Sequence, residues 1–190
     1  RGFTYQRIDR FTNTDVTALV ASFNGDIMFA GTNGGGIHRS TNRGASWTGP
    51  VASLQYAVVG ALAMGPGLAD TSTLFAGIRG SLRISTNLGA SWMPSSLSVP
   101  ELREFHVDST GSHSARVFAG STRGVFVSTD LGLSWLDMTG LLPSNLISAL
   151  ASSPDGMTLF VGTDDAGAYR STDLGRTWTP INAGLADVNV

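Results

Sequence analysis

Apolar residues recur along this chain in short runs that alternate with glycine-rich or polar turns. One series of runs ends in glycine, at 28–31, 74–77, 117–120 and 159–162. A second series precedes it, at 16–20, 58–62, 104–107 and 146–150, and a third follows each glycine, as at 124–128. Short β-prone runs bounded by turn residues predict strands rather than helices. The pattern therefore indicates an all-β protein.

A polar motif ending in tryptophan follows each third run. Its four copies occupy 40–47, 85–92, 128–135 and 171–178, and the tryptophans are 45, 43 and 43 residues apart. This period is typical of a propeller blade of four strands. Strands A, B and C precede the motif, and the tryptophan opens strand D. Because one such sheet cannot bury both of its faces, we expect the sheets to stack around an axis.

The repeat divides the chain into four predicted blades, at 15–57, 58–101, 102–144 and 145–186. Residues 1–14 match the outer strand of a preceding or closing blade, and residues 187–190 match the first strand of a next blade. The predicted fold class is an all-β propeller of four-stranded antiparallel blades. Its four blades are predicted to be either part of a larger propeller or half of a ring closed by a second copy.

Composition limits the classes of partner. The net charge is -2, and the 12 basic residues are all arginines that form no cluster, so no nucleic-acid partner is predicted. The chain has no cysteine, its histidines do not cluster, and no apolar run approaches the ~20 residues that span a bilayer. Gly34, Gly35 and Gly36 join two strands and open no helix, unlike a phosphate-binding loop. We therefore predict no metal, no cofactor and no membrane span.

The tryptophan-ended motif resembles the Asp-box, Ser/Thr-x-Asp-x-Gly-x-x-Trp, of the BNR-type propellers, and the resemblance covers nearly the whole chain. That group includes sialidases, xyloglucan-cleaving glycosidases, sortilin-type receptors and a photosystem II assembly factor. The resemblance implies a propeller fold and leaves function open, since the same blade serves enzymes and binders. The matching residues are Asn42, Gly44, Trp47, Asn87, Gly89, Trp92, Asp130, Gly132, Trp135, Asp173, Gly175 and Trp178.

We predict that the motif is a structural turn rather than a carbohydrate or metal site. A short carboxylate or amide accepts backbone N–H bonds in the turn, the glycine adopts a left-handed conformation, and the tryptophan packs within and between blades. Asn42 and Asn87 replace the aspartate in two copies, which makes calcium binding there less plausible. In the family these turns lie on the face opposite the active site.

Candidate ligand-binding residues lie in the B–C and D–A loops, which share one face of a propeller. The predicted loop-face residues are Asn33, Tyr56, Arg79, Arg123, Asp164 and Asp165. The D–A loops also contain Glu101, Arg103 and Glu104. Arg79 and Arg123 are expected on neighbouring blades, and the two aspartates on the next one.

The loop-face residues match two enzyme classes only in part. A sialidase needs three arginines around a carboxylate, and the third is missing. Residues 163–170 resemble the segment that carries a catalytic aspartate in xyloglucan-cleaving enzymes, with Asp164 at the matching position. Those enzymes use two complete propellers and a second, distant aspartate, which this chain does not supply.

The favoured interpretation is a non-catalytic scaffold or binding module for a protein or glycan partner. A fragment of a glycoside hydrolase is the alternative. We also expect either self-association or continuation into a larger propeller. The resemblance alone implies a secreted, periplasmic or otherwise extracytoplasmic location.

Overall fold

The computed structural model describes residues 15–22, 24–50, 52–65, 73–79, 81–99, 101–108, 116–153 and 157–185. These residues form β-strands and one short 3-10 helix, η1 (Ala52–Leu54). The predicted terminal strands at 1–14 and 187–190 lie outside the described residues. No helix within the described ranges is long and apolar enough to cross a bilayer.

The strands form antiparallel sheets in which each strand pairs with its neighbour in the sequence. Blade 1 contains β1 (Val16–Ala21), β2 (Met28–Thr32) and β3 (Gly36–Ser40). Blade 2 contains β4 (Val59–Gly65), β5 (Thr73–Ile78), β6 (Ser81–Ser85) and β7 (Met93–Pro94). Blade 3 contains β8 (Leu102–Asp108), β9 (Arg116–Ser121), β10 (Gly124–Ser128) and β11 (Leu136–Asp137). Blade 4 contains β12 (Ile147–Ser152), β13 (Leu159–Thr163), β14 (Gly167–Ser171) and β15 (Thr179–Pro180).

Blade 1 differs from the predicted pattern of four strands. Its sheet has three strands, and a single β-bridge between Arg39 and Thr48 stands where the other blades have a fourth strand. Gly49 and Pro50 follow this bridge directly. Because proline has no N–H to donate to a ladder, the pairing does not continue.

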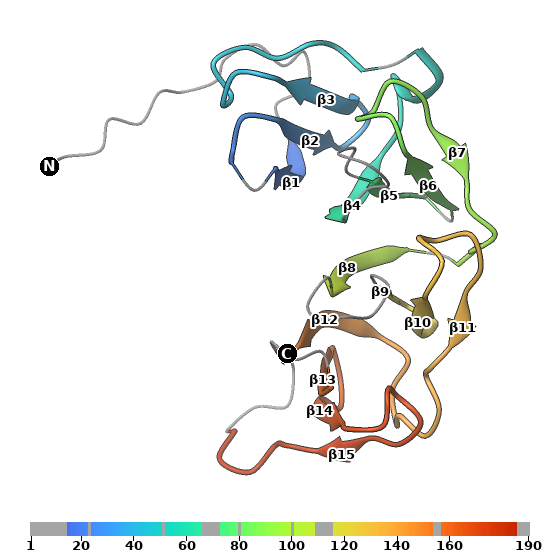
Figure 1. Cartoon of the computed structure of the whole chain (residues 1–190). Coiled ribbons are helices and arrows are strands. Elements are labelled where there is room, and N and C mark those ends of the chain that lie inside the picture. The colour runs from blue at the N-terminus through green and yellow to red at the C-terminus, as the bar shows by residue number, and fades with distance from the viewer. Residues whose placement is uncertain are drawn as a thin grey trace, which may run out of the picture.

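The four sheets follow one another along an arc (Figure 1). Strands β1, β4, β8 and β12 lie on its concave side, and the short outer strands β7, β11 and β15 lie on its convex side. Each inner strand contacts the inner strand of the next blade. This arrangement confirms the predicted all-β fold, a partial propeller.

In blades 1 to 3, the second-to-last residue of strand B is a glycine that contacts a side chain of the next blade. Gly31 lies against Val59, Gly77 against Leu102, and Gly120 against Ile147. The same contact between a glycine and a side chain of the next blade thus occurs at three successive blade boundaries. A Cβ atom added to Gly77 would lie 2.8 Å from the Cβ of Leu102, so the close approach of the blades requires glycine.

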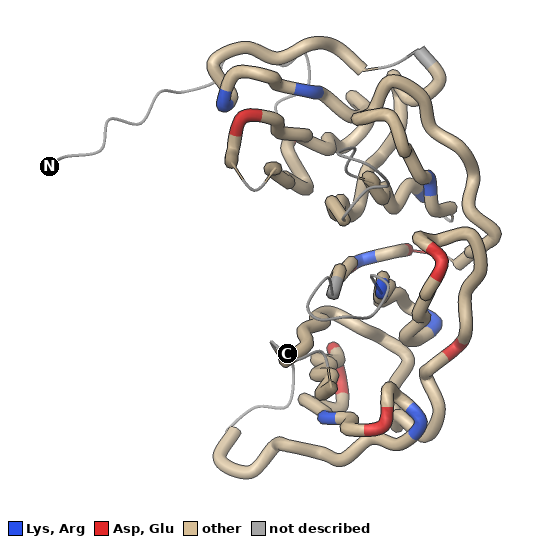
Figure 2. The backbone as a smooth tube through the Cα atoms, in the orientation of Figure 1, with Lys and Arg blue, Asp and Glu red and all other residues tan. Residues whose placement is uncertain are grey.

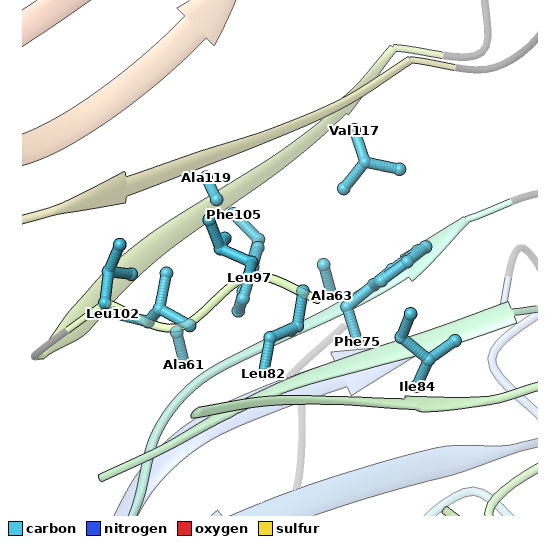
Figure 3. Close-up of a cluster of buried hydrophobic side chains, with 11 residues drawn as sticks. Ala61, Ala63, Phe75, Leu82, Ile84, Leu97, Leu102, Phe105, Val117 and Ala119 are labelled. Carbon is cyan, nitrogen blue, oxygen red and sulfur yellow. The ribbon is translucent and has the colours of Figure 1, made fainter. Parts of the chain in front are cut away.

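Apolar clusters fill the spaces between blades. Figure 3 shows the cluster between blades 2 and 3, where Phe75 and Leu82 from one blade lie near Leu102 and Phe105 from the other. The Phe75 and Phe105 ring centroids are 6.5 Å apart. Burial at these boundaries stabilises the stack, since no single sheet has a core of its own.

Polar side chains within each tryptophan-ended turn form hydrogen bonds that hold the turn together. Asp130 accepts hydrogen bonds from the Ser134 backbone N–H at 2.8 Å and the Ser134 hydroxyl at 2.6 Å. These bonds, chiefly the one from the Ser134 hydroxyl, lower the pKa of Asp130 from 3.8 to about 2. Asn42 has the same geometry, because its Oδ1 accepts the Ser46 N–H and its Nδ2 donates to the Ser46 hydroxyl, both at 2.8 Å. The amide thus replaces the carboxylate without loss of the turn.

Each of these turns places two consecutive residues in the left-handed region. In blade 3 they are Leu131 (φ 58°) and Gly132 (φ 87°). The sequence pattern predicted the glycine conformation but not that of the leucine, which carries a Cβ. Trp135 then reaches back to blade 2, where its indole N–H donates to the Ser95 hydroxyl at 2.9 Å.

Candidate functional site

An open cleft lies between blades 2 and 3 on the side of the B–C and D–A loops. We call it the loop cleft, and its volume is about 360 Å³. Arg79 follows β5, Glu101 precedes β8, and Leu102 and Arg103 begin β8. Leu102 is buried because it packs on Gly77, so the cleft has an apolar floor beneath a charged rim.

Arg103 connects the loop cleft to blade 4. Its guanidinium donates a hydrogen bond to the Asp164 carboxylate, and its Nη2 lies 3.6 Å from Oε2 of Glu101. The hydrogen bond to Asp164 is the main cause that raises the pKa of Arg103. Because both partners are more than a third exposed, 37% and 38%, the pair contributes at most about 1 kcal/mol. Its main effect is to orient Arg103.

Arg79 has a different environment. Its side chain is exposed at the rim of the cleft, and within the described ranges its guanidinium has no hydrogen bond or ion pair. A guanidinium presents several N–H donors in a fixed plane and binds carboxylates in a bidentate manner. Arg79 therefore supplies the cleft with an uncommitted cationic donor.

The backbone at Glu101 is strained. Its φ of 46° places a non-glycine residue in the left-handed region, which costs of order 1–3 kcal/mol. The other such residues of the described chain lie in the four tryptophan-ended turns. Three residues on, burial raises the pKa of the half-buried Glu104. The strained backbone of Glu101 thus lies at the loop cleft, whereas Glu104 does not line it.

Some of the predicted loop-face residues lie close together in the structure, and others lie apart. Arg79 and Asp164 belong to one arrangement through Arg103. Arg123 lines a different cleft, together with Trp135. The six predicted residues therefore do not form one site.

The remaining predicted loop-face residues lie at the surface. Asn33 donates to Asp15 at 2.9 Å, Tyr56 is 81% exposed, and Asp165 is exposed. Among the residues that the structure describes, no group of three or more histidine, aspartate or glutamate side chains is placed to hold a metal ion. Blue and red positions are interspersed along the described tube, without a continuous basic stretch (Figure 2).

Sequence reasoning identified Arg103 and Asp164 as loop residues but did not pair them. They are 61 positions apart and lie on different blades, so only the stacking of the blades brings them together. The left-handed conformation of Glu101 had no sequence signal, since the residue is not glycine.

No protein-family model and no curated protein matches the sequence, whereas many solved structures share its fold. An ancestral GH74 enzyme has a TM-score of 0.74 and 24% identity over 93% of this chain. The GH74 xyloglucanase from Xanthomonas campestris has a TM-score of 0.71 and 18% identity over 97% of this chain. YCF48 bound to D1 peptide has a TM-score of 0.64 and 13% identity over 94% of this chain.

These structures are longer than the chain. It spans 27% of the ancestral enzyme, 32% of the xyloglucanase and 58% of YCF48. The likeness establishes the propeller fold that the repeat predicted.

Proposed function

We propose that the chain is a non-catalytic binding module that holds an acidic segment of a protein partner in the loop cleft. The observation that carries this proposal is Arg79, an uncommitted guanidinium at the rim of an open cleft of about 360 Å³. Arg103 lies beside it, and Leu102 forms an apolar floor. Clefts that combine an apolar surface with a few oriented polar groups are typical of ligand sites.

A peptide suits the shape and charge of this cleft. Its carboxylate side chain would pair with Arg79, and its aliphatic atoms would cover Leu102. The similarity to YCF48, whose structure was determined with a bound peptide, supports a protein ligand for this fold. Glu101 and Asp164 repel the carboxylates of an acidic peptide. They therefore favour the binding position in which the peptide carboxylate lies at Arg79 and away from them.

A peptide-display selection tests the proposal. Random dodecapeptides on phage would be selected against the wild-type chain, the R79E variant and the R170E variant. Arg170 is an exposed arginine of β14, so R170E changes the net charge equally without touching the cleft. Acidic sequences should be enriched by the wild type and by R170E and lost with R79E. Equal enrichment of the same sequences by R79E would refute the assignment.

A glycoside hydrolase fragment is the second candidate, favoured by the similarity to GH74 enzymes and by Asp164. Glycosidases use a pair of carboxyl groups on either side of the scissile bond. In this structure a carboxylate oxygen of Asp164 is bound by Arg103. Release of reducing ends from xyloglucan, abolished by D164N, would establish this second function in place of the first.

We also propose that the exposed face of blade 1, which carries Val16 and Leu19, packs against another blade. That blade belongs either to a larger propeller or to a second copy of the chain. Val16 and Leu19 are 43% and 56% exposed. Their counterparts in blade 2, Val59 and Leu62, are 0% and 9% exposed because they pack on Gly31 of blade 1. Light scattering tests the second-copy form: a dimer that L19E converts to a monomer supports it, and a wild-type monomer contradicts it.

The proposed location is extracytoplasmic. It rests on the resemblance of the fold to that of the BNR-type propellers. Fractionation of cells that express the chain in its natural host would test it, and recovery from the cytoplasm would contradict it.

A further inference from the structure

A second cleft opens between the outer strands of blades 2 and 3, and we call it the outer cleft. Its volume is about 340 Å³, within the range of small-molecule sites, which begins at about 300 Å³. Ser96 and Ser98 lie on the blade 2 side, and Arg123, Phe126, Trp135 and Asp137 lie on the blade 3 side. None of these residues lines the loop cleft.

The repeat provides an internal comparison for the outer cleft. Phe126 of β10 pairs with Asp137 of β11, and the equivalent pair in blade 4 is Tyr169 with Pro180. The Tyr169 hydroxyl donates to the carbonyl oxygen of Ala166 at 2.8 Å, and the tyrosine is buried against blade 3. The anchored Tyr169 ring thus fills this position in blade 4.

Blade 3 departs from that arrangement at three neighbouring positions. Phe126 lacks the hydroxyl that anchors Tyr169. Asp137 stands in place of the proline found in blades 2 and 4. Arg123, which precedes the glycine that starts strand C, stands where blade 4 has Ala166. These differences replace a closed apolar contact with an open cleft that carries both charges.

Arg123 and Asp137 do not form an ion pair with each other. Across the described part of the chain, the Arg123 guanidinium has no hydrogen bond or ion pair. One oxygen of Asp137 accepts the Thr139 N–H at 2.9 Å, which leaves the other oxygen available. A planar donor and a carboxylate acceptor therefore face the same cleft.

The aromatic wall is held in a fixed orientation. The Trp135 indole N–H donates to the Ser95 hydroxyl at 2.9 Å and to the Gly132 carbonyl at 3.0 Å. Because its N–H is already bonded, the indole offers the cleft a rigid apolar surface. Phe126 extends this surface on the neighbouring strand.

We propose that the outer cleft binds a sugar ring of an oligosaccharide. The C–H face of a sugar packs on an aromatic surface, and its adjacent hydroxyl groups both donate and accept hydrogen bonds. Asp137 accepts from one pair of hydroxyls, and Arg123 donates to another. The aromatic wall of Trp135 and Phe126, which the loop cleft lacks, favours a sugar ring over a peptide carboxylate here. This site is independent of the peptide proposed for the loop cleft.

Saturation-transfer NMR with cellotetraose, mannotetraose and chitotetraose tests the site. At least one of these probes should bind the wild type and, in a ¹H–¹⁵N spectrum, shift the Trp135 indole N–H signal. A closing variant, R123A/F126Y/D137P, copies the blade 4 residues and should bind at least about tenfold more weakly, because two charged hydrogen-bonding groups are lost. R123Q and D137N, which preserve side-chain shape, should each weaken binding as well. R79E and R176A, which change arginines outside the outer cleft, should bind as the wild type does.

Three results would overturn the proposal. The first is that none of the three probes binds the wild type. The second is that a probe binds the closing variant or the two single variants as tightly as the wild type. The third is that these probes fail, whereas display-selected peptides bind the wild type and not the closing variant, which would make the outer cleft a peptide site.

Discussion

The guanidinium of Arg103 on β8 donates a hydrogen bond to the carboxylate of Asp164, which follows β13 of the next blade. The bond joins blades 3 and 4 on the loop side and pairs the positive charge of Arg103 with a carboxylate. The charge that the loop cleft offers to an acidic ligand is therefore reduced by a carboxylate of the chain itself.

Removal of that carboxylate should strengthen binding. In D164N, Arg103 loses a competing anion and becomes more available to an acidic peptide. We expect the affinity for a blocked tetraglutamate peptide to rise about two- to fivefold, which corresponds to roughly 0.5–1 kcal/mol for an exposed ion pair. Fluorescence anisotropy with a labelled form of that peptide measures this change. Weaker binding by D164N would mean that Asp164 itself contacts the ligand.

The glycine contacts between blades predict a specific pattern of stability. G77A places a Cβ 2.8 Å from the Cβ of Leu102, and the overpacking should cost about 1–3 kcal/mol of unfolding free energy. Gly49 provides the control, since a Cβ added there meets no atom within 4 Å. Urea denaturation should show a lower midpoint for G77A and little change for G49A. Equal midpoints for the two variants would contradict the proposed packing role.

The tryptophan-ended turns predict a dependence of stability on acid. Because the pKa of Asp130 is lowered from 3.8 to about 2 in the folded chain, its contribution is complete above about pH 4 and is lost as the pH falls towards 2. D130N should therefore lose less stability than the wild type in that interval. N42D should lose more, because it introduces a titrating carboxylate into an equivalent turn. If the urea midpoints of all three proteins fell by the same amount between pH 4 and pH 2, the acid dependence assigned to Asp130 would be refuted.

The hydrogen bond from Trp135 to Ser95 predicts coupling between blades 2 and 3. S95A and W135F should each be destabilising. Since both variants remove the same bond, the double variant should cost less than the sum of the single ones, with a coupling of about 0.5–1.5 kcal/mol. Urea denaturation of the four proteins in this cycle measures the coupling. Strict additivity would show that the bond contributes nothing.

The fold was largely predictable because the repeat is local in sequence. The glycine of each turn and the runs that end at Gly77 or Gly120 are visible in the chain, and the structure confirms the strands that they predict. The clefts were not predictable to the same degree. Arg79 and Glu101, far apart in sequence, line one cleft, and Asp137 is unusual only when compared with Pro180 at the paired position of another blade. Such relationships depend on how the sheets stack, which no local pattern encodes.

The most direct test of the loop cleft as a binding site is a ¹H–¹⁵N NMR titration with the blocked tetraglutamate peptide. The account predicts shifts of the Arg79 and Arg103 side-chain Nε–H signals and of the Gly77 and Leu102 backbone amides, all of which are lost in R79E. Shifts confined to arginines outside the cleft, such as Arg39 and Arg116, or no shifts at all, would contradict it.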